Sequence, residues 1–89
     1  MVNSNRRSDI EIVGEILTLT RDGIRKTEIL YQGKLSYTQL QSYLSFLLRK
    51  NLVEEEMVND NGGPYRLYKL TSKGSTVLSD IEKVITHLR

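Results

Sequence analysis

A run of uncharged polar side chains within residues 36–50 is the part of this chain best suited to molecular recognition. The run is rich in hydroxyl and amide groups, and no acidic residue occurs in residues 33–52. Such groups exchange hydrogen bonds with base edges, and they do so without repelling a polyanion. The side chains expected to contact bases or the groove are Ser36, Tyr37, Thr38, Gln39, Gln41, Ser42 and Ser45.

Basic side chains flank this run and are expected to contact phosphates. Residues 21–50 carry a net charge of +4, residues 51–64 a net charge of −4 and residues 65–89 a net charge of +3, whereas the whole chain carries only +2. A local positive field therefore exceeds what the total charge indicates. Contacts with phosphates position a protein on a duplex without reading its sequence. The expected phosphate contacts are Arg25, Lys26, Thr27, Lys34, Arg49 and Arg66.

Two helices joined by a short turn are predicted to position these side chains. A short helix covers about residues 26–32, and its first amides are free to attract anions. A longer helix covers about residues 36–50 and is apolar on one side only, because large apolar residues recur there every three or four positions. That apolar side consists of Leu40, Tyr43, Leu44, Leu47 and Leu48. The alternative for this helix is an ordinary amphipathic helix with a solvated polar face.

The ends of these two helices are marked by local signals. Ser36 and Gln39 have the spacing of a capping box at the start of the longer helix, and Asn51 is a suitable terminator. Thr27 is a possible cap of the shorter helix. Gly33 is expected in the left-handed conformation between them, where a side chain would clash.

Two further helices are predicted near the ends of the chain. Ser8 and Glu11 have the spacing of a second capping box, and a last helix begins near Ser72 and runs almost to Arg89. Both carry a wider apolar stripe than a helix on a single core needs. This width favours homodimerisation over the alternative in which the two helices only bury each other. The expected dimer contacts are Ile12, Ile16, Leu19, Val77, Ile81, Val84 and Leu88.

A β-hairpin with a long loop is predicted between the third and fourth helices. The strands cover residues 52–58 and 65–71, and residues 59–64 form a cluster of turn residues. Tyr68 and Leu70 are placed inward, and Leu67 and Lys69 outward. Glutamates occupy positions 54–56, and the tip of the hairpin holds no lysine or arginine. We therefore expect either that this strand faces away from phosphates or that the hairpin contributes little to DNA binding.

The order helix, helix, helix, hairpin, helix predicts an α+β winged helix-turn-helix, made of three helices and a β-hairpin wing, with an added C-terminal dimerisation helix. Residues 1–7 are expected to be a flexible N-terminus, residues 8–71 the winged domain and residues 72–89 the dimerisation helix. Five segments are characteristic: IVGEIL at 12–17, KTEI at 26–29, LSYTQL at 35–40, LVE at 52–54 and YKLTSKG at 68–74. Through them, over roughly residues 10–80, the chain resembles small archaeal winged helix-turn-helix regulators and chromatin-associated proteins. It is more distantly similar to multiple-antibiotic-resistance-type repressors.

The resemblance implies DNA binding and usually a homodimer. We therefore expect a sequence-specific, double-stranded DNA-binding transcriptional regulator from an archaeon or an archaeal virus, with residues 36–50 as its recognition helix in the major groove. One alternative is a chromatin protein of the same fold that binds DNA without sequence preference. Another is a winged-helix protein-interaction module, which the acidic strand and the uncharged tip favour.

Composition narrows the remaining classes. A chain of 89 residues makes one small domain, and it contains no cysteine for a disulfide or a thiolate metal site. No apolar run approaches the roughly 20 residues of a membrane span, and residues 1–9 are too polar for a signal peptide. His87 is the single histidine, and no catalytic set is present. We expect no enzyme activity, cofactor, metal or membrane contact, and a cytoplasmic, nucleoid-associated protein; a small-molecule effector stays open.

Overall fold

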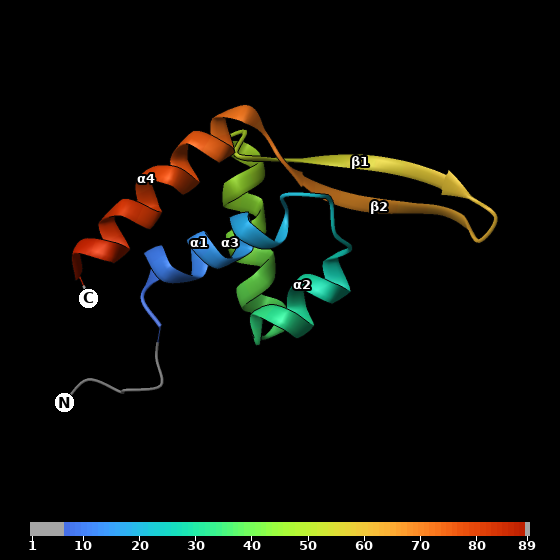
Figure 1. Ribbon diagram of the computed structural model, residues 1–89. Coiled ribbons are helices and arrows are strands. Elements are labelled where there is room, and N and C mark those ends of the chain that lie inside the picture. Colours follow the sequence, from blue (N-terminus) through green and yellow to red (C-terminus); the bar gives the residue numbers. More distant parts are fainter. Residues whose placement is uncertain (1–6, 89) are drawn as a thin grey trace.

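The computed structural model describes residues 7–88 as four helices and one antiparallel hairpin (Figure 1). The elements in order are α1 (Asp9–Leu19), α2 (Lys26–Gly33), α3 (Tyr37–Arg49), β1 (Val53–Asp60), β2 (Gly63–Leu70) and α4 (Ser72–Leu88). This order confirms the predicted α+β winged helix-turn-helix with a C-terminal helix. The expected flexible N-terminus lies outside the described residues, except for Arg7.

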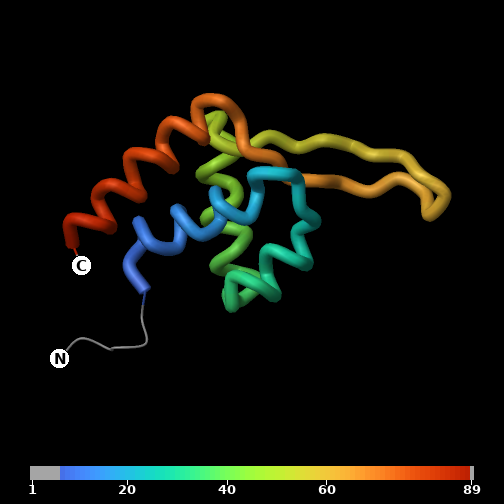
Figure 2. Tube along the Cα trace, in the orientation of Figure 1, coloured from blue at the N-terminus to red at the C-terminus, as the bar shows by residue number. Residues whose placement is uncertain are grey.

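The helices form one body from which the hairpin projects. In Figures 1 and 2, α4 lies on one side of α3, α1 begins on that side and overlaps α3 in the view, α2 lies below the base of the hairpin, and β1 and β2 extend away from all four helices. The molecule is consequently elongated, with extents of 49 × 26 × 19 Å. Within residues 7–88, no helix combines the length and apolar character that crossing a membrane requires.

One hydrophobic core joins the helices to the base of the hairpin. α1 and α4 approach closely at Gly14, where an added Cβ would lie 3.1 Å from Ile81 Cγ2. Tyr68 of β2 is also buried. The buried apolar residues are Ile12, Ile16, Leu17, Ile24, Ile29, Leu35, Leu40, Leu44, Leu47, Leu52, Val53, Tyr68, Leu78 and Ile81.

This core corrects part of the dimer prediction. Ile12, Ile16 and Ile81 are only 6%, 1% and 7% exposed, because α1 and α4 bury them between each other and against the rest of the core. Assigning these three side chains to a second subunit was wrong, since their own protomer already covers them.

Both predicted capping boxes are present. At α1 the Glu11 amide donates to Ser8 Oγ at 3.2 Å, and at α3 the Gln39 amide donates to Ser36 Oγ at 3.2 Å. Each pair thereby satisfies amides that a helix start leaves unpaired. Asn51 adopts a left-handed φ of 61° just after α3, which fits its predicted role as a terminator.

The turn between α2 and α3 differs from the prediction. Lys34, not Gly33, takes the left-handed conformation, with φ 54°. α2 continues through Gly33, and the amides of Lys34 and Leu35 then donate to carbonyls of the last turn of α2 at 3.4 and 3.3 Å. This pairing requires a left-handed residue at position 34. Thr27 is not the cap either, because the N-cap residue is Arg25 and no side chain caps that end.

The hairpin is longer and its turn tighter than predicted. β1 and β2 pair in register from Val53–Leu70 to Asp60–Gly63, so only Asn61 and Gly62 form the turn. The six-residue loop prediction was wrong because Gly63, with φ 95°, and Asp60 join the ladder.

The base of the hairpin is anchored to the connection between α1 and α2. Tyr68 and Ile24 exchange hydrogen bonds between their main chains at 2.8 and 3.1 Å, so Ile24 forms a single antiparallel bridge with β2. Tyr68 is buried as predicted and Lys69 is exposed. Leu67, expected outward, is half-buried because it packs beside Gly23.

Candidate nucleic-acid interface

The outward side of α3 presents small polar groups and one cation. Thr38, Ser42, Ser45 and Arg49 follow one another at spacings of four, three and four residues, which places them on the side of the helix opposite the buried leucines. All four are exposed, as is Gln41 beside them. Within residues 7–88, the side chains of these five residues make no hydrogen bond, so their own protomer leaves them available to a ligand.

The capping box at the start of α3 engages two of the predicted base contacts. Gln39 Oε1 accepts a hydrogen bond from the Ser36 amide at 3.0 Å, while Ser36 Oγ accepts from the Gln39 amide. Recognition of adenine by glutamine needs both the amide oxygen and the amide nitrogen. Gln41, which has no such contact, is therefore better placed than Gln39 for a bidentate contact with a base.

Two aromatic rings organise the cations near the start of α2. Lys26 Nζ lies 5.1 Å from the centre of the Tyr37 ring, and Arg25 Cζ lies 4.1 Å from the centre of the Tyr65 ring. Both distances suit cation–π contacts, which restrict the side chains without neutralising their charge. Lys26 is thus held beside the first residue of α3, and Arg25 beside β2. Thr27 is exposed in the first turn of α2.

The other predicted phosphate contacts differ in availability. Lys34 is exposed in the turn and Arg49 is exposed on the outward side of α3. Arg66 already has a partner in the wing, because its Nε lies 3.0 Å from Glu55 Oε2. A hydrogen bond to Tyr68, together with the Glu55 carboxylate, raises the pKa of Arg66. The wing therefore offers less free positive charge than its sequence indicates.

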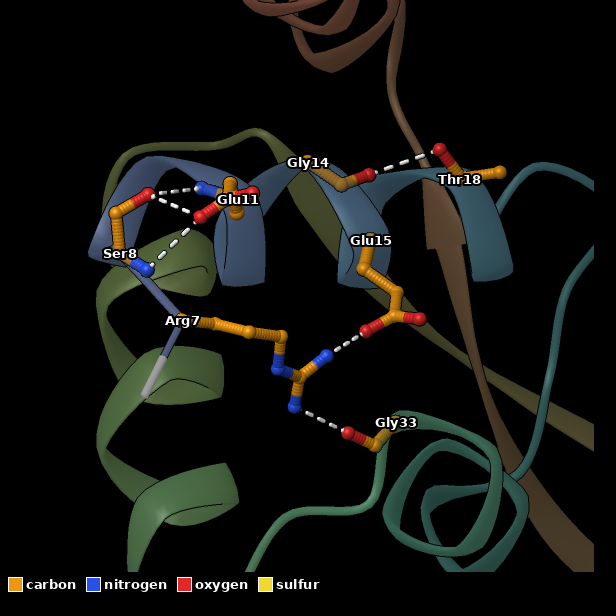
Figure 3. Close-up of polar contacts among 7 residues, drawn as sticks. All are labelled: Arg7, Ser8, Glu11, Gly14, Glu15, Thr18 and Gly33. Atoms are coloured by element: carbon orange, nitrogen blue, oxygen red, sulfur yellow. Dashed lines mark hydrogen bonds and ion pairs between the residues drawn. The ribbon is translucent and has the colours of Figure 1, made fainter. Parts of the chain in front are cut away.

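Sequence reasoning missed a clamp made by Arg7 (Figure 3). The Arg7 guanidinium forms an ion pair with Glu15 of α1 and donates to the carbonyl oxygen of Gly33 at 2.5 Å. This contact satisfies a carbonyl at the end of α2 and connects α1 to the turn before α3. A local pattern gives no signal for it, since Gly33 lies 26 residues beyond Arg7.

The LTSKG segment holds the other end of α3. Thr71 Oγ1 donates to the carbonyl of Asn51 at 2.6 Å and accepts from the Gly74 amide at 2.9 Å. Lys73 Nζ donates to the carbonyl of Lys50 at 3.0 Å. A cation at a helix C-terminus is favourable because the carbonyls there carry partial negative charge. The motif thus fixes the C-terminal end of α3 against the start of α4.

A groove runs beside the outward side of α3, and Phe46 lines it. Its volume is about 640 Å³. Tyr43 donates its hydroxyl proton to Asp9 Oδ1 at 2.5 Å across one end, and this hydrogen bond is the main cause that raises the pKa of Tyr43. Sequence analysis did not single out Phe46, although it lies four residues after Ser42 and so on the polar side. The groove is lined by Asp9, Val13, Thr38, Gln39, Ser42, Tyr43, Phe46 and Arg49.

The remaining predicted dimer contacts have exposed surface. Val84 and Leu88 are 43% and 75% exposed near the C-terminal end of α4, and Leu19 and Val77 are half-buried. Leu88 also lines a second groove, between the start of α1 and the end of α4, together with Ser8, Ile10, Glu11 and Ile85.

These features define a winged helix. A short helix crosses a longer exposed helix, and a hairpin follows whose proximal end is hydrogen-bonded to the chain between the first two helices. Comparison with known families agrees, because a winged helix-turn-helix model matches residues 6–88. The chain belongs to the winged helix-turn-helix family. No curated protein sequence matches it significantly.

Several solved structures share the fold over most of this chain. The DNA-binding protein Sso10a-2 from Sulfolobus solfataricus is 25% identical, with a TM-score of 0.74 over 90% of this chain and 80% of that one. A PadR-like transcription factor from Bacteroides fragilis is also 25% identical, with a TM-score of 0.74 over 88% and 82% of the two chains. A PadR family transcription regulator from Clostridium difficile is 21% identical, with a TM-score of 0.78 over 86% and 88%. The chain has the winged-helix fold of DNA-binding transcription regulators.

Proposed function

We propose that this protein is a sequence-specific regulator of transcription that binds double-stranded DNA as a homodimer, with α3 in the major groove. The observation that carries the proposal is the outward side of α3, where Thr38, Gln41, Ser42 and Ser45 are exposed and unengaged within their own protomer. Their hydroxyl and amide groups match the donors and acceptors of base edges. Basic side chains around this side would contact phosphates of the DNA backbone and so set the register of the protein on the duplex.

The surroundings of α3 support docking on a duplex. The first turn of α2 has no side-chain cap, so the amides of Lys26 and Thr27 are free to meet a phosphate beside Arg25. The two similar structures at 25% identity are described as a DNA-binding protein and a transcription factor. The exposed apolar end of α4 supports a second subunit, and a twofold pair of α3 helices would address half-sites about 34 Å apart.

Selection from random duplexes tests the proposal directly. The full chain, incubated with a random library at moderate salt, should enrich a site with two related half-sites. Gel-shift titrations of that site should then show tighter binding than a scrambled duplex. The logarithm of the association constant should fall by about 0.9 per log unit of salt for each phosphate contact. Enrichment of no site, despite binding at low salt, would contradict sequence-specific recognition.

Binding without sequence preference is a second candidate function. The engagement of Ser36 and Gln39 in the cap favours it, because it leaves fewer free groups for base edges. In that case loss of Lys26 or Arg49 would weaken binding to all duplexes alike, and Gln41→Ala would have no effect on preference.

A protein-interaction module is a third candidate, favoured by the three exposed glutamates of β1. It predicts no DNA binding even at low salt.

A further inference from the structure

Phe46 breaks the pattern of the side of α3 that faces away from the core. It is the only phenylalanine of the chain and is 40% exposed, whereas the leucines of α3 are buried or half-buried. Phe46 follows Ser42 by four positions and precedes Arg49 by three, so all three lie along one flank of the helix. Its ring lines the same groove as Thr38.

The exposed ring is a cost for the free protein that a ligand can remove. Burial of apolar surface is favourable by about 25 cal/mol per Å², and the rest of the protomer covers Phe46 only in part. The groove also contains hydroxyl groups and Arg49, so its occupant should offer both an apolar group and polar partners. The major-groove edge of thymine does so, with its C5 methyl beside the O4 acceptor.

We propose that Phe46 is a specificity-determining residue that packs against the C5 methyl group of a thymine at the edge of the site read by α3. The inference rests on the proposed function and deepens it, because it assigns a base and an atom of that base to one side chain. It adds an apolar contact to a helix whose other expected contacts are hydrogen bonds.

Near Asp9, charge favours a base edge over the DNA backbone as the occupant of this groove, whereas Arg49 is the groove residue expected to meet a phosphate. The Asp9 carboxylate lies on one wall, where it is held by the Tyr43 hydroxyl. A phosphate entering beside Asp9 would be repelled, whereas an uncharged methyl group would not.

Position selects DNA over a second subunit. A subunit seated in the groove would cover Thr38, Ser42 and Arg49 together with Phe46. The most exposed apolar residue of α4, Leu88, lines a different groove, at the junction of α1 and α4. A dimer contact there leaves the groove beside α3 open.

Substitution of single thymines by deoxyuridine tests the contact, because it removes only the methyl group. Duplexes carrying the selected site, with each thymine replaced in turn, are titrated with the wild-type chain and with Phe46→Ala. We expect one symmetric thymine position at which deoxyuridine weakens wild-type binding about fourfold per half-site, the equivalent of about 0.8 kcal/mol. Phe46→Ala should bind both duplexes alike at that position.

Two further variants make the result specific. Phe46→Leu keeps an apolar side chain and should retain part of the discrimination, with circular dichroism confirming that each variant is folded. Tyr31→Ala removes another exposed aromatic, 86% exposed on α2, and should discriminate as the wild type does.

The outcomes separate this inference from the function on which it rests. If the wild type prefers a selected site yet tolerates deoxyuridine at every position, the methyl contact is overturned and sequence-specific binding stands. If Phe46→Ala keeps the full discrimination, another residue reads the methyl and the assignment is overturned. If the wild type selects no site at all, the proposed function and the inference fall together.

Discussion

Replacing Gly74 with alanine should destabilise this fold more than any other glycine-to-alanine change among the described residues. Gly74 lies in the first turn of α4, directly against the chain that leaves α3. A Cβ at this position would lie 2.0 Å from the carbonyl oxygen of Leu52 and 2.7 Å from Leu70 Cδ1. The nearest obstacle is main chain, so no change of rotamer relieves the clash.

The size of the effect follows from the displacement required. An ordinary contact begins at 3.4 Å, so α4 and the Leu52 peptide must separate by about 1.4 Å. Overpacking of this kind costs about 1–3 kcal/mol. The movement also loosens the Thr71 and Lys73 hydrogen bonds, each of which contributes about 1 kcal/mol. Alanine regains about 1 kcal/mol of helix propensity. The expected loss of stability is about 2–4 kcal/mol.

Thermal unfolding followed by circular dichroism measures this loss. For a domain of this size, about 2–4 kcal/mol corresponds to a fall in Tm of roughly 10–25 °C. Gly14→Ala is the matched control, because its Cβ would meet side-chain atoms and no main chain, Ile81 Cγ2 at 3.1 Å and Ile85 Cδ1 at 3.9 Å, and we expect a change within about 1 kcal/mol. A Tm for Gly74→Ala within a few degrees of the wild type would refute the reasoning from this contact.

Three other predictions concern recognition, assembly and pH. Gln41→Ala should relax base preference at one position by about 1–3 kcal/mol in gel shifts, whereas Gln39→Ala should mainly lower Tm through loss of the cap; equal effects on preference would count against this division. Val84→Glu should convert a dimer to folded monomers in light scattering, and a persistent dimer would exclude this surface. Because the Asp9 hydrogen bond raises the pKa of Tyr43 above its ordinary value of 10, its stabilising contribution is complete below pH 10 and lost above it as Tyr43 ionises. The difference in stability between the wild type and Tyr43→Phe should therefore be smaller at alkaline pH than at neutral pH. Urea titrations of both proteins on both sides of pH 10 check this.

The parts of the fold that depend on local spacing were predictable from sequence. The capping boxes at Ser8 and Ser36 involve residues only three positions apart, so the sequence alone contains all the information that predicts them. The order of the elements also followed from periodicity and turn residues.

Features that depend on the residue at which a helix ends, or on distant partners, were not predictable in the same way. Gly33 has the residue type that favours a left-handed turn, yet the last hydrogen bonds of α2 place that conformation at Lys34. The apolar stripe of α1 contains Ile12 and Ile16 whether their neighbour is α4 or another subunit, and only the packed structure assigns them to the core.

The candidate site shows the same division. The exposure of Thr38, Gln41 and Ser42 followed from helical spacing, but the engagement of Arg66 by Glu55 required knowledge of the strand register. Phe46 was recoverable in principle, because its spacing from Ser42 places it on the polar side of α3.

The most direct test of the central claim is a nuclear magnetic resonance titration of the isotopically labelled chain with its selected duplex. If the outward side of α3 meets the bases, the largest shifts should fall on Thr38, Ser42 and the side-chain amide of Gln41, with smaller ones at the start of α2. Shifts confined to α4 or to the acidic strand β1, with α3 unchanged at saturation, would contradict it.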